Sequence, residues 1–459
     1  MLFFKSRLRR LRFWQALIIA YFARYRFRLF LTLFLTFTIV FTVYKISPII
    51  FRSNILAVGY VGNYSLESIP SEVLTQVTGS LIKSSQSGKP LPSLSSHWTV
   101  SEDGKTYVVF LRDNITWHDL SQVSAKDISI AINNVKITAL NNKTIEFVLP
   151  NPITSFPLVL DKPIFKVNTF YGTGNFVISA IEQNNGIVRK LSLHPKDKNL
   201  PRLEIKFYPS EEQAKIALKI GEVKTLYVSQ AKDFETWPNM TVEKKIDTTE
   251  IVTIFFNNQD KLLASKELRQ ALSFAINKSN FDGEINHSPI SSSSWAFNDS
   301  VKRYDYNVAK AKELLSKVNL QNSKITLTYT QDLEDLAQKI KTDWEAIGVI
   351  TELKSEKNLP KDYQALVAIN KLPRDPDQYG LWHSTQKETN ITGYKNVKID
   401  KLLEDGRISQ EETKRKEFYL DFQKFLSEDA PATFLYHPYK YKVTYNNIAQ
   451  LLAKLPETK

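Results

Sequence analysis

The segment at residues 98–119, WTVSEDGKTYVVFLRDNITWHD, constrains the fold of this chain more than any other stretch. Its Asp103-Gly104 dipeptide supplies the positive φ angles that a tight hairpin turn needs. The run at residues 106–111 is β-branched and aromatic, which is typical of a largely buried strand. Residues 124–127 then have the spacing of a helix capping box. We therefore expect a β-hairpin that leads into a short helix.

The net charge of +13 belongs almost wholly to the amino terminus. Residues 1–52 hold ten Lys and Arg and no Asp or Glu, which leaves 51 of the 61 basic residues against all 48 acidic residues for the rest of the chain. Binding to nucleic acid needs a basic face on a folded domain, and a nearly neutral body does not offer one. We therefore expect no nucleic-acid partner.

The same amino terminus predicts a membrane anchor. Residues 29–44 are uncharged and apolar, and residues 46–51 extend this run past Lys45 toward the ~20 residues that span a bilayer. Eight basic residues lie within residues 1–28, so the positive-inside rule places this basic segment in the cytoplasm and the main domain outside. No small-residue cleavage site follows, which favours an uncleaved signal anchor at residues 29–51. We expect a single-pass protein of the cell membrane whose main domain is on the periplasmic or extracellular face.

The residue types that carry enzyme chemistry form no recognisable pattern. The chain has no cysteine, which excludes disulfides, thiolate metal sites and cysteine nucleophiles. No serine lies in a nucleophile-elbow pattern, and adjacent carboxylates such as Glu211 and Glu212 point in different directions on a helix. We expect no enzyme, no metal and no other cofactor. The histidines, none of which has metal-ligand spacing to another, are His97, His118, His194, His287, His383 and His437.

Strand-like and helix-like segments alternate along the rest of the chain, which indicates a mixed α/β (α+β) fold. Residues 252–256 have the pattern of a buried strand, and the apolar positions in residues 268–276 recur at helical spacing. Ser210 and Gln213 belong to a second capping box. A final strand is expected at residues 433–435, before a short polar tail.

The order of these motifs resembles that of the extracellular solute-binding proteins of family 5, the oligopeptide- and dipeptide-binding receptors of ABC importers. The matches run in the family's order from about residue 55 to about residue 440. Leu120 stands where the family has a glycine after the His-Asp pair. The segments that carry the resemblance are SEDGKTY at 101–107, WHD at 117–119, GTGNF at 172–176, FFNN at 255–258, LRQALSFAINK at 268–278 and NITGYKNVKIDKLLEDG at 390–406.

The resemblance implies a periplasmic-binding-protein type II-like fold, a two-lobed Venus flytrap behind the amino-terminal transmembrane helix. Lobe II is then expected at residues 252–433. A reduced accessory domain is expected at residues 68–162, packed on lobe I. Lobe I is expected to be discontinuous and to consist of residues 54–67, 163–251 and 434–449.

The resemblance also implies where the ligand binds. In peptide-binding members, the strand that matches residues 366–371 runs beside the ligand and pairs with its backbone, which is β-augmentation. The family commonly continues with Asp-Tyr-Pro-Asp-Pro, and the first Asp neutralises the amino terminus of the ligand. Leu372 stands at that position and cannot pair with an ammonium group, which is costly to leave unpaired in a closed cleft.

The remaining charges and rings near this position are therefore candidates, each with a structural alternative. Asp375 and Asp377 are either ligand contacts or capping residues of a turn. Arg374 could instead favour an acidic or carboxylate-bearing ligand. Tyr379 and Trp382 either line the cleft or pack in the core. The candidate ligand-binding residues are Ala368, Ile369, Asn370, Lys371, Leu372, Arg374, Asp375, Asp377, Tyr379 and Trp382.

We expect a monomeric, membrane-anchored receptor that captures a peptide or similar small ligand by lobe closure. It would deliver that ligand to the permease and ATPase subunits of an ABC importer. An alternative keeps the fold without transport, as a diverged sensor or scavenger, and is suggested by Leu372 and the uncleaved anchor. A surface hydrolase would need a catalytic constellation that the sequence lacks.

Overall fold

The computed structural model describes residues 14, 16–17, 20, 24–25, 27, 31–32, 34–42, 55–320 and 323–455. The chain divides into two compact units, Met1–Ile55 and Leu56–Lys459. In the first unit residues 34–42 are helical. Among the described residues, no helix is both long enough and apolar enough to cross a membrane. The predicted anchor at residues 29–51 is described only in part, because residues 29–30, 33 and 43–51 lie outside the described residues.

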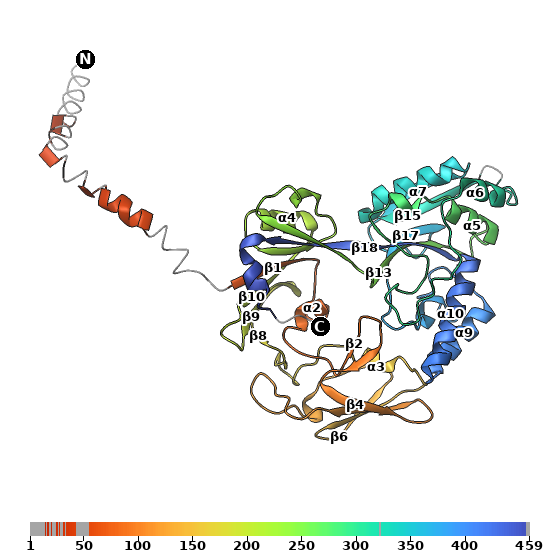
Figure 1. Cartoon of the computed structure of the whole chain (residues 1–459), viewed down its shortest axis with the longest axis horizontal. Helices are drawn as coiled ribbons and strands as arrows, with labels where there is room; N and C mark the ends of the chain where they lie inside the picture. Colours follow the sequence, from red (N-terminus) through yellow and green to blue (C-terminus); the bar gives the residue numbers. More distant parts are fainter. Residues whose placement is uncertain are drawn as a thin grey trace, which may run out of the picture. The chain divides into compact units, whose positions relative to one another are not determined.

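The second unit contains a 12-stranded sheet in its described part, ordered β16-β15-β17-β13-β18-β11-β1-β10-β9-β8, with β12 and β14 also pairing with β18 (Figure 1). Segments from the beginning, middle and end of the chain thus share one sheet. The strands are β1 (Ile55–Val61), β8 (Phe176–Asn184), β9 (Ile187–Pro195), β10 (Arg202–Tyr208), β11 (Thr225–Val228), β12 (Met240–Ile246), β13 (Glu250–Phe256), β14 (Gly283–Ile285), β15 (Lys324–Thr330), β16 (Ile350–Glu356), β17 (Ala365–Lys371) and β18 (Ala432–Tyr445).

Strand β18 joins the two halves of this sheet. Its first residues pair with β13, and its last residues pair with β11 and β12. The predicted strand at residues 433–435 is therefore correct in place, but the predicted polar tail is wrong. The sequence YKYKVTY continues the strand. In it, Tyr441 and Val443 are buried while Lys440 and Lys442 reach solvent, and this alternation is the two-residue period of a half-buried strand.

Helices cover both faces of the β13–β17 half of the sheet. Because successive side chains of a strand point to opposite faces, β13 places Ile254 in one core and Phe255 in the other. The predicted amphipathic helix is α5, which begins at Lys266, and its apolar face lies in the first of these cores. The helices on the first face are α5 (Lys266–Phe274), α6 (Val308–Leu315) and α7 (Glu334–Ala346); those on the second are α8 (Tyr379–Trp382), α9 (Val397–Ile408) and α10 (Glu412–Asp429).

The other half of the sheet is built on the same alternation. In β1, Leu56 and Val58 lie in one core and Ala57 lies in the opposite one. Helix α4 (Glu211–Lys219) packs on the second of these cores, and the hydroxyl of Ser210 accepts a hydrogen bond from the backbone N–H of Gln213. The predicted start of this helix is thus confirmed, with Ser210 as its N-cap.

The predicted hairpin is confirmed as β4 (Ser95–Val100) and β5 (Thr106–Leu111), with Gly104 at φ +68° in the connection. Together with β6 (Lys136–Asn141) and β7 (Thr144–Val148), these two strands form a separate sheet in the order β4-β5-β7-β6. The short helix expected after the hairpin is only a 3₁₀ turn at Ala125–Asp127. Ile128 is extended and bridges Lys166, so the turn cannot propagate. The predicted lobe boundaries stay a prediction.

Candidate functional site

The carboxyl-terminal end of β17 presents an open strand edge. This strand pairs with β13 along its whole length, whereas β15 pairs with it only as far as Val367. From Ala368 onward, no described strand pairs with the second edge. Ala368 is buried in the core, but the side chain of Ile369 is 39 % exposed and Lys371 is exposed. Backbone donors and acceptors on an unpaired edge can bind another extended chain.

Directly after β17, the chain lines a cavity of about 100 Å³. Its other walls are three loops that are distant in the sequence, within residues 85–88, 248–249 and 291–294. Seven of the described lining residues are Ser or Thr, and none is Asp or Glu, so we name it the hydroxyl cavity. The lining residues are Ser85, Gln86, Ser87, Gly88, Thr248, Thr249, Ser291, Ser293, Ser294, Leu372, Pro373 and Arg374.

Gly88 makes the close approach of two of these walls possible. Its φ of +84° lies in the left-handed region that favours glycine. A Cβ atom at this position would lie 2.1 Å from the backbone carbonyl oxygen of Arg374. The backbone N–H of Trp295 also donates to the carbonyl of Ser87, at 3.0 Å. The loop at residues 85–88 is therefore packed against two segments from the other half of the chain.

A second cavity, of about 380 Å³, adjoins the first and shares Pro373 and Arg374 with it. We name it the arginine cavity. Its volume is within the range of about 300–1,000 Å³ that is usual for ligand pockets. Helix α3 (Phe156–Val159) and its flanking residues form one side of it. The lining residues are Ser155, Leu158, Val159, Asp161, Pro373, Arg374, Asp375, Asp377 and Arg407.

Asp375 is held in the protein interior. Its residue is 7 % exposed, and the guanidinium of Arg415 donates to both carboxylate oxygens, with Nη1 at 3.0 Å from Oδ2. Burial acts to lower the pKa of Arg415, but the charge of Asp375 and its hydrogen bonds with the guanidinium outweigh this effect and raise that pKa. Asp375 also accepts the backbone N–H of Asp377, at 2.9 Å. These contacts favour the structural alternative for Asp375, because its charge is already neutralised from α10.

Asp377 links the two sides of the arginine cavity. Its Oδ1 accepts the backbone N–H of Tyr379 at 3.0 Å, which places it at the start of α8. Its Oδ2 lies 3.4 Å from Nε of Arg407 and accepts a hydrogen bond of 3.3 Å from the hydroxyl of Ser155. The Arg407 guanidinium lies 4.4 Å from the ring centroid of Tyr379. Asp377 and Tyr379 are therefore positioned by each other and by Arg407.

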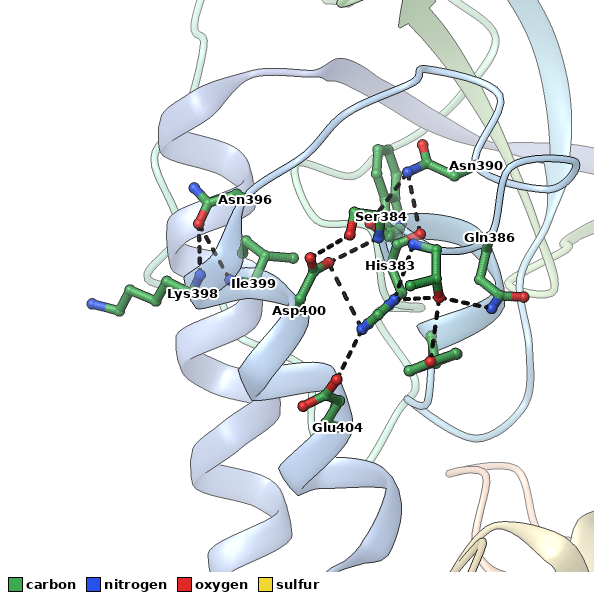
Figure 2. Close-up of polar contacts among 12 residues, drawn as sticks. His383, Ser384, Gln386, Asn390, Asn396, Lys398, Ile399, Asp400 and Glu404 are labelled. Atoms are coloured by element: carbon green, nitrogen blue, oxygen red, sulfur yellow. Dashed lines mark hydrogen bonds and ion pairs between the residues drawn. The ribbon is translucent and has the colours of Figure 1, made fainter. Parts of the chain in front are cut away.

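A polar cluster behind the cavity wall fixes the ring of Tyr379, which stacks on His383 with centroids 4.1 Å apart. Nε2 of His383 lies 3.2 Å from Oε1 of Glu404, and both the backbone N–H and the hydroxyl of Ser384 donate to Asp400 (Figure 2). Since Asp400 and Glu404 belong to α9, these contacts tie the loop after α8 to that helix. These contacts give His383 a structural role at this position.

The predicted site residues thus fall into four places. Ile369, Asn370 and Lys371 follow the open edge of β17. Ala368 and Trp382 lie in the core, where Nε1 of Trp382 donates to Gln378. The ring of Tyr379 is placed behind the wall by His383. The residues on the cavity walls are Leu372, Arg374, Asp375 and Asp377.

The sequence interpretation missed the opposite walls of both cavities. Residues 85–88 and 291–294 have only the composition of loops, and Arg407 has only that of an exposed helix position. The two loops share only a high content of Ser and Thr, which many other connecting segments of proteins also have. Within the described part of the chain, no three His, Cys, Asp or Glu side chains gather so as to hold a metal ion.

The family model described as "Bacterial extracellular solute-binding proteins, family 5 Middle" matches residues 129–389, more than half of the chain. The chain belongs to this family. The oligopeptide-binding protein AppA of Bacillus subtilis is 25 % identical to it, over 86 % of this chain and 88 % of AppA. The probable D,D-dipeptide-binding periplasmic protein DdpA of Escherichia coli is 22 % identical, over 75 % of this chain and 78 % of DdpA.

Solved structures share the fold of this family 5 protein. NikZ from Campylobacter jejuni, in complex with Ni(L-His), has a TM-score of 0.70 at 21 % identity and covers 86 % of this chain and 94 % of its own. AppA from Bacillus subtilis, in complex with a nonapeptide, has a TM-score of 0.67 at 20 % identity and covers 86 % of this chain and 97 % of its own. The fold is therefore the mixed α/β, two-lobed binding-protein fold. Its membership of family 5 makes the protein a solute-binding protein and not an enzyme.

Proposed function

We propose that this family 5 protein is the extracytoplasmic receptor of an ABC importer. It binds a peptide or a similarly sized small ligand between two lobes and presents it to a permease with its ATPase. The observation that carries this proposal is the pair of adjoining cavities beside the open edge of β17, whose walls come from both halves of the chain. Relatives named for oligopeptide binding and a similar structure in complex with a nonapeptide support the peptide as ligand class.

The proposed mechanism is closure around the ligand. A peptide that extends along residues 368–371 forms backbone hydrogen bonds with the open edge of β17, which gives affinity with little dependence on side chains. The same ligand contacts the loop at residues 85–88 across the hydroxyl cavity. Since it then interacts with both walls, it stabilises the closed arrangement over the open one. No covalent step is required.

We also propose that residues 29–51 anchor the protein in the membrane, with residues 1–28 in the cytoplasm. The support is the charge and hydropathy pattern of the sequence. Membrane fractionation of cells that express the full chain, or a chain that lacks residues 1–53, tests this proposal. The full chain is expected in the membrane fraction and the shortened chain in the supernatant. Equal distribution of both would contradict the anchor.

Native mass spectrometry of residues 54–459, purified without denaturation, tests the ligand class. Adducts whose masses differ by those of amino-acid residues support a permissive peptide receptor. A single discrete adduct would overturn the peptide assignment in favour of one specific small ligand. A protein that is empty and gains no thermal stability from a peptide pool would favour the alternative of a diverged sensor or scavenger that is not coupled to transport.

A further inference from the structure

Arg374 is the charged residue that the two cavities share. Its side chain is exposed, and it forms no hydrogen bond or ion pair with another described residue. Its backbone is fixed, because its carbonyl packs against Gly88 and the next residue, Asp375, is anchored by Arg415. The guanidinium is thus a cation without an ion-pair partner in the described part of the chain, on a backbone held by these contacts.

The carboxylates near Arg374 are already engaged with other groups. Asp375 receives two hydrogen bonds from Arg415, and Asp377 is next to Arg407 and Ser155. Asp161, on the opposite wall of the arginine cavity, accepts the backbone N–H of Ser84 at 2.8 Å and the hydroxyl of Ser80 at 3.3 Å. Asp161 keeps its negative charge, because both of these donors are neutral, but it lines only the arginine cavity. Among the described residues that line the hydroxyl cavity, Arg374 is the one charged residue, so the charge offered to a ligand there is positive.

The hydroxyls of the hydroxyl cavity also favour a ligand group that carries oxygen atoms. Several of its hydroxyls bond to one another: Ser85 to Ser87 at 3.1 Å, Ser291 to Ser293 at 2.9 Å, and Ser293 to Thr248 at 3.3 Å. Such hydroxyls can rotate and donate to an incoming oxygen. In the hydroxyl cavity, an ammonium group would meet Arg374 and no carboxylate among the lining residues, and an unpaired charge in a closed site is costly. A carboxylate would instead pair with a planar guanidinium, the geometry that gives strong bidentate hydrogen bonds.

We propose that this site selects its ligand by a carboxylate, anchored by Arg374 and the hydroxyl cavity, and that it requires no free ammonium group. The inference rests on the proposed receptor function and specifies the ligand class: peptides or other small molecules with a free carboxylate, including those whose amine is blocked. Arg374 acts as a specificity-determining residue that touches the ligand directly.

Three forms of one peptide test this proposal: trialanine, N-acetyl-trialanine and trialanine amide. Calorimetric titration of the full chain in detergent is expected to give affinities for the two free acids within about threefold of each other. The amide is expected to bind at least about tenfold more weakly, because it cannot form the charge-assisted hydrogen bonds that each contribute about tenfold or more in affinity. Tighter binding of the amide than of N-acetyl-trialanine would overturn the inference.

Variants at Arg374 test whether this residue causes the preference for a free carboxylate. Arg374→Gln is expected to bind both acids about ten- to a hundredfold more weakly, with little change for the amide, while Arg374→Lys keeps part of the preference because it keeps the charge. Arg202→Gln is the matched control, since Arg202 is exposed on β10 and lines neither cavity. Unfolding midpoints of all variants are measured alongside.

The possible failures are distinguishable. If Arg374→Gln keeps the wild-type midpoint and also the wild-type preference for acids, the assignment of Arg374 is overturned while the receptor function stands. If the amide binds as tightly as the acids, the carboxylate preference is overturned and peptide binding still stands. If the wild type neither binds any of the three peptides nor is stabilised by them, the peptide-receptor function and this inference both fail.

Discussion

Asp375, on the wall of the arginine cavity, forms a buried ion pair with Arg415. Asp375→Asn leaves the guanidinium of Arg415 without its counter-ion in the interior. We expect the free energy of unfolding to fall by about 3–5 kcal/mol, the usual cost of removing one partner of a buried pair. Urea unfolding followed by tryptophan fluorescence measures this loss.

An exposed ion pair supplies the control for this prediction. The carboxylate of Asp299 is 79 % exposed and lies 2.8 Å from Nη2 of Arg303. Asp299→Asn is expected to change the free energy of unfolding by less than about 1 kcal/mol, because water screens exposed pairs. Equal losses in the two variants would show that burial of the Asp375 pair does not decide its contribution.

His287 is expected to make the protein less stable in acid. Burial, and then the adjacent charge of Lys278, lower the pKa of His287 to about 4 from its ordinary 6.5. Nζ of Lys278 lies 3.1 Å from Nδ1 of His287, and the imidazole is 19 % exposed. Between pH 6.5 and pH 4 the unfolded chain therefore binds a proton at this position and the folded chain does not, so stability falls as the pH falls.

The size of this effect follows from the shift in pKa. At about 1.4 kcal/mol for each pH unit, the contribution of His287 to acid destabilisation is about 3 kcal/mol over that interval. His287→Gln is expected to unfold with a shallower dependence of stability on pH, measured by urea unfolding at pH 7, 6, 5 and 4. His194→Gln is the control, since His194 is exposed. Parallel pH profiles for wild type and His287→Gln would contradict the prediction.

At the level of elements, the loop at residues 85–88 and the segment after β17 meet at Gly88. Gly88→Ala places a Cβ atom 2.1 Å from the carbonyl oxygen of Arg374, so the two walls of the hydroxyl cavity must separate. We expect the affinity for trialanine to fall by at least about tenfold, which corresponds to 1.4 kcal/mol. Calorimetric titration measures it.

Gly186 offers a matched control for Gly88. Its φ is +77°, close to the +84° of Gly88, but a Cβ atom there would meet nothing within 4 Å. Gly186→Ala therefore carries the same backbone strain, about 1–2 kcal/mol of stability, without the steric contact. If both variants lose affinity equally, backbone strain and not the contact with Arg374 is the cause.

The elements that the sequence predicted well are those determined by neighbouring residues. The hairpin of β4 and β5 depends on Asp103-Gly104, and the start of α4 depends on Ser210. The turn at Ala125–Asp127 was mispredicted as a helix because a distant contact decides it, the bridge between Ile128 and Lys166. Local patterns carry no information about such a partner.

For the same reason, the sequence predicted only one wall of the candidate site. The order of motifs located residues 372–377, but the roles within them depend on distant partners. Asp375 is 40 positions from Arg415, whose pairing with it removes its charge from the cavity. The loops at residues 85–88 and 291–294 become walls only through tertiary packing. The sequence therefore offered Arg374 and Asp375 as equal candidates, and packing distinguishes them.

At the level of the whole molecule, the two halves of the sheet share β18, a single strand of 14 residues. The connection from β12 to β13 crosses at the same place, where Lys440 of β18 pairs with both Asp247 at 2.7 Å and Glu250 at 3.1 Å. Thr248 and Thr249, between these two acidic residues, line the hydroxyl cavity. A rearrangement between the halves would therefore move residues that line the hydroxyl cavity.

Every residue in the hydrophobic cores of the described part of the chain is Leu56 or lies after it. These cores therefore belong to the second unit. Removal of residues 1–53 is expected to leave cooperative unfolding and to shift the thermal midpoint by no more than about 1 °C, the effect of roughly 1 kcal/mol in a domain of this size. A ligand at 100 times its Kd stabilises the folded state by about 2.7 kcal/mol. Trialanine should therefore raise the midpoint of both chains equally.

A chain that starts at residue 62 is the control for this truncation. It lacks β1, and with it Leu56, Val58 and the parallel pairing of β1 with β11. Each fully buried leucine contributes about 2 kcal/mol or more, and the loss of the strand exposes its neighbours as well, so this chain is not expected to fold. Calorimetry and far-ultraviolet circular dichroism compare the three chains. If the chain from residue 54 unfolds without cooperativity, or binds trialanine more weakly than the full chain, the first unit contributes to the fold or to the site, and the ligand site must then be sought with that unit included.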